Sequence, residues 1–302
     1  MNTLQTIGVL AHPYRPATAP LAEKVAASLR AKGKAVWLRT AWNPSDVQAN
    51  VAKSDLVIAI GGDGAMLRTA RLCAPYGVPI LGVNAGHLGF LTEVAQDGWE
   101  EAEARLLKGD FWLEHRMMLR CEIWNKQDNR CQTTEDALND VVIGRGAIAR
   151  SVYLDAYIND IWTTTYNADG VIIATPTGST AYALAVGGPL LPPKLKNIVI
   201  VPVAPHLSMD RSIVISEEDK IRINVAPRHS ELEVVVTIDG ELIGSLNIGD
   251  YVLISASERV SSFVRMREDG YFFRSILDRL EPRLAVQRHY DENSSADEYK
   301  ER

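Results

Sequence analysis

The chain has 302 residues, 46% hydrophobic and 23% charged, which is enough apolar material for one large folded domain or two ordinary ones. The formal net charge is −6 and no basic run stands out, which argues against general nucleic-acid binding. Three cysteines without a Cys-x-x-Cys pair argue against a disulfide framework or a zinc site and favour a reducing compartment. No signal peptide or membrane-spanning stretch is recognisable, so we expect a cytoplasmic protein without membrane partners.

The first hundred residues alternate between strand and helix patterns. We expect strands at 6–11, 35–39, 55–60 and 78–83, and helices at 19–31, 65–73 and 98–108. Strands that alternate with helices are typical of a parallel sheet covered by helices. The sequence therefore predicts an α/β domain over residues 1–112.

The pattern changes after this point to short, closely spaced strand-like runs. They are expected at 118–125, 138–143, 151–158, 162–166, 171–175, 198–203, 221–225, 232–238 and 251–255. Runs of this kind, separated by turn signals, are typical of an all-β sandwich or barrel, here predicted over residues 113–262 with one helix embedded at 179–186. Residues 263–285, with helical spacing at 271–280, are predicted to return to the first domain, and the polar residues 286–302 to form a disordered tail.

The first candidate motif, Gly61-Gly62-Asp63-Gly64, lies between a buried strand and a helix. Such a turn is a phosphate cradle, because glycines let a ligand approach the backbone and the helix N-terminus offers free N–H groups. Asp63 places a negative charge there, which suits a metal ligand, or a base that accepts the proton of a hydroxyl group being phosphorylated. A helix N-cap is the purely structural interpretation. Neither a P-loop nor a Gly-x-Gly-x-x-Gly turn is present.

The second candidate motif is Asn167-Ala168-Asp169-Gly170, followed after one strand by Thr-Pro-Thr-Gly-Ser-Thr-Ala-Tyr at 175–182. Its four hydroxyl groups and the helix N–H groups are predicted to form a hydrogen-bonding surface for a ribose, a phosphate or a base edge. Tyr182, one turn into the helix, is predicted to stack on a purine. The structural alternative is an ordinary N-capped helix with a core tyrosine.

Weaker signals lie elsewhere in the chain. Asn139-Asp140 suits the hydroxyl groups of a ribose but is more often a turn, and Asp239-Gly240 is more typical of a hairpin turn. Arg68 and Arg150 are candidate phosphate clamps. The six histidines show no metal-binding spacing, and no Gly-x-Ser-x-Gly occurs, so neither a zinc site nor a hydrolase nucleophile is expected.

Together these motifs, with Asn84-x-Gly86-x-Leu88-Gly89-Phe90-Leu91, resemble the NAD kinase family over residues 55–273. The resemblance implies an α/β domain, a β-sandwich domain and a site in the crevice between them. It also implies transfer of a phosphoryl group from ATP to the 2′-hydroxyl of the adenosine ribose of NAD, giving NADP and ADP, by a homodimer or homotetramer. Mg²⁺ or another divalent cation is expected with the ATP, bound mainly by its phosphates rather than by a protein cage.

The resemblance also assigns residues. Asp63 matches the catalytic base, Asp140 stands where the family commonly has Glu, and Asp169 corresponds to an acid near the nicotinamide amide. Glu241 stands where the family often has Gln. The residues that the resemblance places at the substrates are Gly61, Gly62, Asp63, Gly64, Arg68, Asn139, Asp140, Arg150, Asn167, Asp169, Thr177, Thr180, Ala181, Tyr182, Ala183, Leu184 and Ala185.

Two alternatives remain at this point. Lipid kinases and phosphofructokinases also use Gly-Gly-Asp-Gly, but they resemble this chain mainly in its first hundred residues, and the segment 175–182 argues against them. A non-catalytic module that senses NAD or NADP needs the pocket but has no use for Asp63 as a base. The sequence leaves open whether ATP, another triphosphate or polyphosphate is the preferred donor, and whether NADH is accepted.

Overall fold

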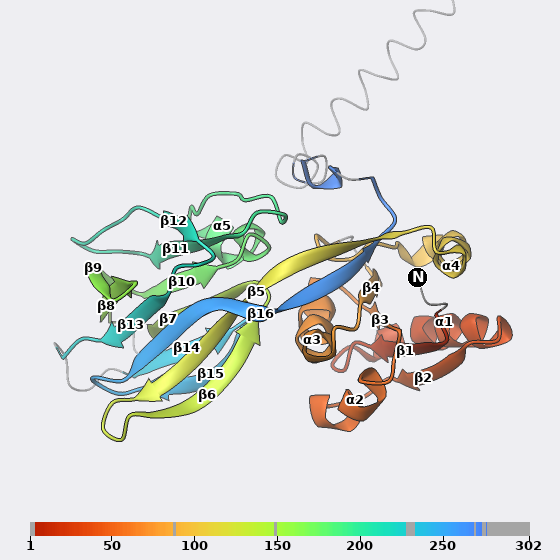
Figure 1. The fold of residues 1–302 in the computed structure, drawn as a ribbon, viewed down its shortest axis with the longest axis horizontal. Helices are drawn as coiled ribbons and strands as arrows, with labels where there is room; N and C mark the ends of the chain where they lie inside the picture. Colours follow the sequence, from red (N-terminus) through yellow and green to blue (C-terminus); the bar gives the residue numbers. More distant parts are fainter. Residues whose placement is uncertain are drawn as a thin grey trace, which may run out of the picture.

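The computed structural model describes residues 4–86, 89–147, 150–227, 233–268, 270–273 and 276. It has two lobes, an α/β domain and a β domain, which two long strands connect (Figure 1). The predicted tail at 286–302 and most of the predicted helix at 271–280 lie outside the described residues. Among the residues that are described, no helix is long and apolar enough to cross a membrane.

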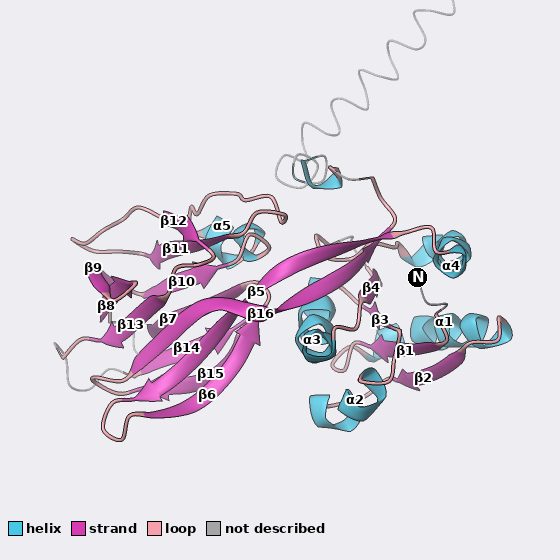
Figure 2. Cartoon of the chain, in the orientation of Figure 1, coloured by secondary structure: helices cyan, strands magenta, loops and turns pink. Residues whose placement is uncertain are grey.

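The α/β domain holds a parallel sheet with the strand order β2-β1-β3-β4. Its strands are β1 (Thr6–Ala11), β2 (Ala35–Arg39), β3 (Leu56–Ile60) and β4 (Ile80–Val83), and its helices are α1 (Ala19–Ala31), α2 (Pro44–Val51), α3 (Asp63–Cys73) and α4 (Trp99–Lys108) (Figure 2). Every residue of β3 is buried, as expected for a central parallel strand. The predicted parallel sheet is confirmed, and β1, α1 and β2 have the predicted bounds.

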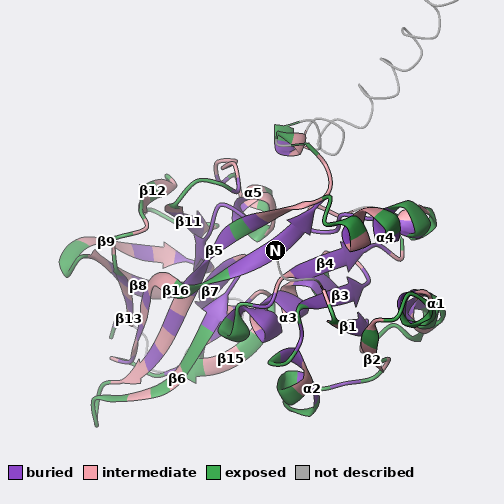
Figure 3. Ribbon diagram, turned by 45° about the vertical axis from the view of Figure 1, so that its right-hand side comes forward, coloured by how far each residue is buried: buried purple, intermediate pink, exposed green. Residues whose placement is uncertain are grey.

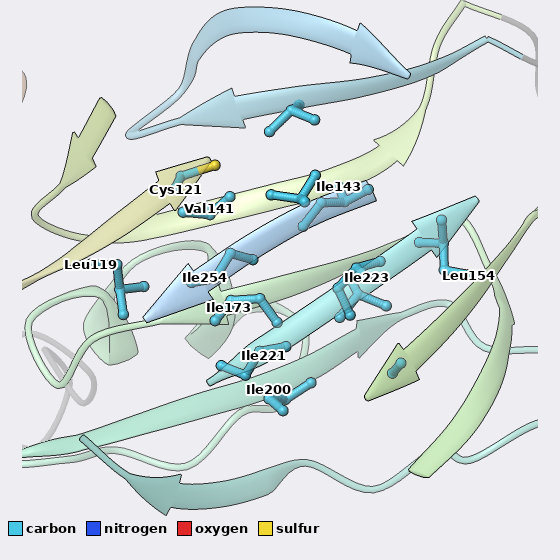
Figure 4. Packing of buried hydrophobic residues seen from close by; sticks show 14 of the residues in the cluster. Leu119, Cys121, Val141, Ile143, Leu154, Ile173, Ile200, Ile221, Ile223 and Ile254 are labelled. Carbon is cyan, nitrogen blue, oxygen red and sulfur yellow. The ribbon is translucent and has the colours of Figure 1, made fainter. Parts of the chain in front are cut away.

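The β domain consists of two packed sheets. A six-stranded antiparallel sheet, in the order β12-β11-β10-β7-β14-β15, faces strands β6, β5, β16, β13, β8 and β9. Their bounds are β5 (Trp112–Asn125), β6 (Arg130–Ala137), β7 (Asp140–Arg145), β8 (Val152–Ile158), β9 (Ile161–Ala168), β10 (Gly170–Ala174), β11 (Asn197–Val203), β12 (Ile213–Ser216), β13 (Ile221–Val225), β14 (Val234–Ile238), β15 (Glu241–Leu246) and β16 (Tyr251–Arg265). Alternate residues such as Ile221 and Ile223 of β13 enter one core with Val141 and Ile143 of β7 (Figure 4). The predicted sandwich is therefore confirmed.

The long strands β5 and β16 join the two domains. They pair with each other along their length, and β16 also pairs with β13 in the β domain and with β4, through Phe263 and Ile80, in the α/β domain. Residues 261–265 are all buried at this junction (Figure 3). The predicted strands 118–125 and 251–255 are too short, because a register shift between Ala256 and Val260, at exposed residues, interrupts the alternation of apolar side chains.

A buried cluster of charged residues ties the junction together. Arg265, fully buried, donates to Glu114 (2.8 Å), to Glu93 (3.1 Å) and to the carbonyl oxygen of Leu91 (3.0 Å). Arg116 donates to the same Glu114 at 2.9 Å. Burial by itself raises the pKa of Glu114, but the adjacent Arg116 and Arg265 lower it below its usual value. The carboxylate is thus charged and paired, as a buried charge has to be.

Candidate active site

The glycine turn follows β3 at the point where the strand order of the parallel sheet reverses. The carboxyl ends of β1 and β3 meet there, which is where open α/β sheets bind ligands. A Cβ atom on Gly61 would lie 2.7 Å from the Cβ of Ala65, so the turn requires glycine. His12, which directly follows β1, lies beside this turn; sequence analysis did not assign it to the site. The sequence feature that could have pointed to His12 is its position directly after a buried strand.

Asp63 is the first residue of α3, and Gly62 is the N-cap, so the N-cap interpretation of Asp63 is wrong. Its carboxylate oxygens instead accept hydrogen bonds from the backbone N–H groups of Phe90 (2.8 Å) and Leu91 (2.9 Å). A Cβ atom on Gly89 would overlap this carboxylate, which explains the glycine there. Asp63 therefore holds the loop that follows β4, and each oxygen keeps a further lone pair for another donor.

Asn139 and Asp140 are held by a residue that sequence analysis placed only in a hairpin turn. The carboxylate of Asp239, between β14 and β15, accepts the backbone N–H groups of Leu138 (3.0 Å), Asn139 (2.7 Å) and Asp140 (3.2 Å). Burial, reinforced by the charge of Asp239, raises the pKa of Asp140 to about 7. Near neutral pH the Asp140 carboxyl is therefore a hydrogen-bond donor in a substantial fraction of molecules.

Each of the four hydroxyl groups of the turn at 175–182 has a partner within the protein, and the hydrogen-bonding surface for a ligand stays a prediction. Thr175 donates to the carbonyl oxygen of Leu138 (2.6 Å), Ser179 to that of Pro176 (2.7 Å) and Thr180 to that of Thr177 (3.0 Å), and Thr177 accepts from Arg116 (3.4 Å). These bonds close the turn against the backbone at Asn139, where Gly178 leaves no room for a Cβ atom.

The helix predicted at 179–186 is split at Ala181 into a single 3-10 turn (Gly178–Thr180) and α5 (Tyr182–Ala185). The non-helical backbone at Ala181 turns Tyr182 outward, and this side chain is 46% exposed. Ala183 is fully buried and packs against Ile172 and Val199. Of the residues in α5, Tyr182 alone lines the cavities described next.

Four cavities form a row that begins on the β domain and continues along its boundary with the α/β domain. We name them the Asp169 cavity (about 350 Å³), the Asp140 cavity (about 400 Å³), the Gly64 cavity (about 190 Å³) and the Trp42 cavity (about 760 Å³), each after one lining residue. Neighbours share walls: the first two share Val142, Tyr182 and Thr237, the second and third share Leu67, Asp239 and Gly240, and the last two share Arg68, Arg71 and Glu241. Neighbouring cavities therefore adjoin one another, and we call the row the groove.

Two arginines of α3 that line the groove, Arg68 and Arg71, share one carboxylate. Glu241 at the start of β15 accepts from Arg68 at 2.7 Å and from Arg71 at 2.9 Å. Burial, and then the charges of Arg15 and Arg68, lower the pKa of the adjacent His12 below its usual value. Arg71 was missed by sequence analysis, although it lies one helical turn after Arg68 on α3.

Other candidate residues lie at the edges of the groove or away from it. Asp169 lines its cavity and pairs with Arg145 at 3.2 Å. Asn167 lies in β9 with a buried side-chain oxygen that has no partner among the described residues. Arg150 is exposed. The residues of the resemblance that line none of the four cavities are Gly61, Gly62, Asp63, Arg150, Asn167, Thr177, Thr180, Ala183, Leu184 and Ala185.

Models of one known protein family match both domains that form this site. The family model described as the ATP-NAD kinase N-terminal domain matches residues 16–111, and that of the ATP-NAD kinase C-terminal domain matches residues 138–266. This chain belongs to the ATP-NAD kinase family. Its relatives in this family include the NAD kinase of Caldanaerobacter subterraneus subsp. tengcongensis, 43% identical over 73% of this chain and 77% of that protein. The NAD kinase of Chloroflexus aurantiacus is 38% identical over 92% of this chain and 99% of that protein.

Solved structures of the ATP-NAD kinase family share the fold. The yeast NADH kinase, crystallised with NADH, superimposes with a TM-score of 0.81 over 93% of this chain and 88% of that one, at 23% identity. The NAD kinase from Archaeoglobus fulgidus in complex with ATP gives a TM-score of 0.72 over 90% of this chain and 97% of that one, also at 23% identity. The predicted two-domain fold is confirmed, and a lipid or sugar-phosphate kinase is not favoured, because the match includes the β domain.

Proposed function

We propose that the protein transfers the terminal phosphoryl group of ATP to the 2′-hydroxyl of the adenosine ribose of NAD, giving NADP and ADP. Membership of the ATP-NAD kinase family supports this activity, and the row of adjoining cavities at the glycine turn is the structural observation that carries it. A dinucleotide in the Asp140 and Asp169 cavities has Tyr182 at their shared wall and Asp169 at the far end. Its ribose then faces the Gly64 cavity, beside the turn after β3.

In this arrangement Tyr182 stacks on the adenine, and Asn139 and Asp140 bind the ribose. Asp63 accepts the hydroxyl proton late, as the new O–P bond forms, because a ribose hydroxyl is too weakly acidic to be deprotonated beforehand. The carboxylate binds the backbone N–H groups of Phe90 and Leu91 and does not line the Gly64 cavity, so the hydroxyl proton goes to a lone pair that these N–H groups leave free. The rest of the rate acceleration comes from alignment and charge neutralisation.

Mg²⁺ or another divalent cation enters with the donor. Among the described residues no group of three or more His, Cys, Asp or Glu side chains is arranged to hold a metal ion. A cation held mainly by phosphate oxygens needs few protein ligands, and the carboxylate residues Asp239 and Glu241 line the Gly64 cavity. When bound, the cation neutralises charge that develops on the transferred group.

The activity is tested by incubating the purified protein with NAD, ATP and Mg²⁺ and detecting NADP with an NADP-specific dehydrogenase. We expect NADP to form in proportion to enzyme, and absence of NADP while NAD binds would refute the proposal. Tyr182→Ala is expected to raise the KM for NAD by about tenfold through lost stacking, with an unchanged KM for ATP. An unchanged KM for NAD would remove Tyr182 from the acceptor pocket.

Assembly and location are also part of the proposal. Exposed Ile161, Trp162 and Leu207 on the β domain support self-association into a homodimer or homotetramer. Light scattering after size exclusion measures the mass, and a monomer at micromolar concentration would contradict this.

The three cysteines, Cys73, Cys121 and Cys131, are free, which supports a reducing compartment such as the cytoplasm.

A further inference from the structure

The loop at 89–93, between β4 and α4, is held from two sides. On one side the backbone N–H groups of Phe90 and Leu91 bind the Asp63 carboxylate at 2.8 and 2.9 Å. On the other side two arginines at the end of β16 bind carbonyl oxygens of the loop. Neither the loop nor these arginines line any of the four cavities, so none of them is placed to contact a substrate there.

The two arginines fix consecutive carbonyl groups. Arg265 donates to the carbonyl oxygen of Leu91 at 3.0 Å, and Arg267 donates to that of Thr92 at 2.7 Å. Together with the two N–H groups that bind Asp63, four consecutive peptide units therefore each have a partner outside the loop. Because a peptide unit is planar and stiff, moving the carbonyl end of this segment also moves its N–H end.

We propose that Arg267, together with Arg265, is a positioning residue of the phosphoryl transfer: it holds the loop at 89–93 so that the Asp63 carboxylate faces the hydroxyl group of the acceptor. The inference rests on the proposed function and adds the residues that set the direction of its base. Two further features support it. Glu93 fixes the arginines themselves, and β16 carries them from the domain of the proposed acceptor site.

Glu93 fixes the orientation of both arginines. Its Oε2 atom accepts hydrogen bonds from Arg265 at 3.1 Å and from Arg267 at 3.0 Å. Its Oε1 atom accepts the backbone N–H groups of Met266 and Arg267 at 2.8 Å each. Burial by itself raises the pKa of Glu93, but the adjacent Arg265 and Arg267 lower it below its usual value. The carboxylate is therefore charged, and it holds the guanidinium groups in one orientation toward the loop.

The arginines lie at the end of a strand that both domains share. Ile254 of β16 lies in the core of the β domain, and Val264 lies in the core of the α/β domain (Figure 1). Arg265 is the last residue of β16, and Arg267 follows two residues later. β16 shares the core of the β domain with β7, the strand that begins at Asp140. A strand that packs in the domain of the proposed acceptor site therefore also holds the loop that orients the base.

The direction of the Asp63 carboxylate decides whether it can accept the hydroxyl proton. As the ribose oxygen forms a bond to the terminal phosphorus, the bond from that phosphorus to its bridging oxygen breaks, and the electron pair leaves with ADP. The hydroxyl proton passes to an Asp63 lone pair that the N–H groups of Phe90 and Leu91 leave free. A rotation of the carboxylate turns this lone pair away from the hydroxyl group, which lowers turnover without weakening substrate binding.

Arg267→Met removes the hydrogen bond to the loop and keeps a long side chain beside the Tyr271 ring. We expect kcat to fall about tenfold, because a misplacement of about 1 Å caused far from the chemistry lowers rates by up to about a hundredfold. The KM values for NAD and ATP should stay within twofold, since Arg267 lines none of the four cavities. A fall in kcat of less than threefold would overturn the proposal.

Arg222→Met is the matched control. Arg222 of β13 has surroundings similar to those of Arg267: its side chain is 27% exposed against 28%, it pairs with the Asp160 carboxylate at 3.5 Å, and it lies over the ring of Tyr157. It lies in the β domain and lines none of the four cavities, so kcat and both KM values should stay within twofold. An equal fall in kcat would show that the loss of any such arginine has this effect, and it would overturn the proposal.

Combining Arg267→Met with Asp63→Asn distinguishes a positioning role from a merely structural one. If Arg267 acts through the Asp63 carboxylate, Arg267→Met should lower kcat about tenfold in the unaltered protein but less than about twofold in the Asp63→Asn background. A similar fall in both backgrounds would overturn the proposal, because the effect of Arg267 would then be independent of Asp63.

If Arg267→Met fails to fold, Arg267→Lys replaces it in the same comparisons. An ammonium group is a compact point charge and cannot bind the Glu93 carboxylate and the Thr92 carbonyl oxygen as the planar guanidinium group does. We therefore expect kcat to fall several-fold with unchanged KM values, and a kcat within twofold of the unaltered enzyme would overturn the role of Arg267. Absence of NADP from the unaltered protein would instead refute the proposed function.

Discussion

Asp63→Asn separates the structural role of this side chain from its proposed role as the base. The carboxylate accepts two backbone N–H groups, from Phe90 at 2.8 Å and Leu91 at 2.9 Å. The amide oxygen of an asparagine accepts one of these backbone N–H groups, but its NH₂ group faces the other one, so that hydrogen bond is lost. A hydrogen bond to a charged group contributes about 1.5–3 kcal/mol, so we expect the free energy of unfolding to fall by about that amount.

The same change removes the proposed proton acceptor. Loss of a general base lowers turnover by about 10²–10⁴-fold, so kcat should fall in this range while NAD still binds. Turnover is measured by coupling NADP to an NADP-specific dehydrogenase, NAD binding by calorimetry, and stability by urea unfolding monitored by circular dichroism.

Gly89→Ala supplies the matched control for the loop. Its new methyl group presses on the Asp63 carboxylate and disturbs the loop at 89–91 but leaves the carboxylate in the protein. If Asp63 is the base, Gly89→Ala should retain far more turnover than Asp63→Asn at a similar loss of stability. Equal losses of kcat would show that Asp63 acts by holding the loop, and a kcat for Asp63→Asn within tenfold of the unaltered enzyme would refute the base assignment.

Three further predictions concern charge and metal. Burial raises the pKa of Asp140 to about 7, so the folded state holds a proton that the unfolded chain releases near pH 4, and the free energy of unfolding falls as the pH rises from about 4 to about 7. Asp140→Asn should therefore be more stable than the unaltered protein at pH 8 but not at pH 4. Urea unfolding that shows no such pH dependence would contradict this. Arg265→Met leaves the buried carboxylates of Glu93 and Glu114 short of a partner and should lower the free energy of unfolding by about 3–5 kcal/mol. Arg267 also pairs with Glu93, at 3.0 Å, and Arg116 with Glu114, at 2.9 Å, so a loss below about 1 kcal/mol would show that these two arginines suffice. EDTA should abolish turnover without shifting the urea midpoint, because the donor carries the cation; a lowered midpoint would indicate a structural metal site.

A chain of hydrogen bonds through buried charged groups connects several of the residues in these predictions. Asp63 binds the backbone of Leu91, whose carbonyl oxygen accepts from Arg265. From Arg265 the chain of bonds continues into the β domain; its members are Glu114, Arg116 and Thr177. The two candidate turns, at 61–64 and 175–182, are thus linked through buried groups that tolerate little displacement.

Local patterns determined much of this protein. The apolar run before Gly61 predicts β3, the helical spacing and Gly33 predict α1 and its end, and the turn at 61–64 predicts a ligand-binding end of the sheet. These signals work because a strand, a helix end or a tight turn depends on a few neighbouring residues. Helix α2 was missed, although Asn43 and Asp46 form a capping box there, because its eight residues carry too little apolar periodicity.

Only the tertiary structure decided how the site is assembled. It turned the hydroxyl groups of Thr175 and Ser179 inward, and placed Asp239 under a turn about a hundred residues away. It also extended β16 from one domain into the other and brought α2 opposite β6 and β15 to form the Trp42 cavity. A sequence pattern carries no record of which distant partner satisfies a buried polar group, because that choice is made by packing.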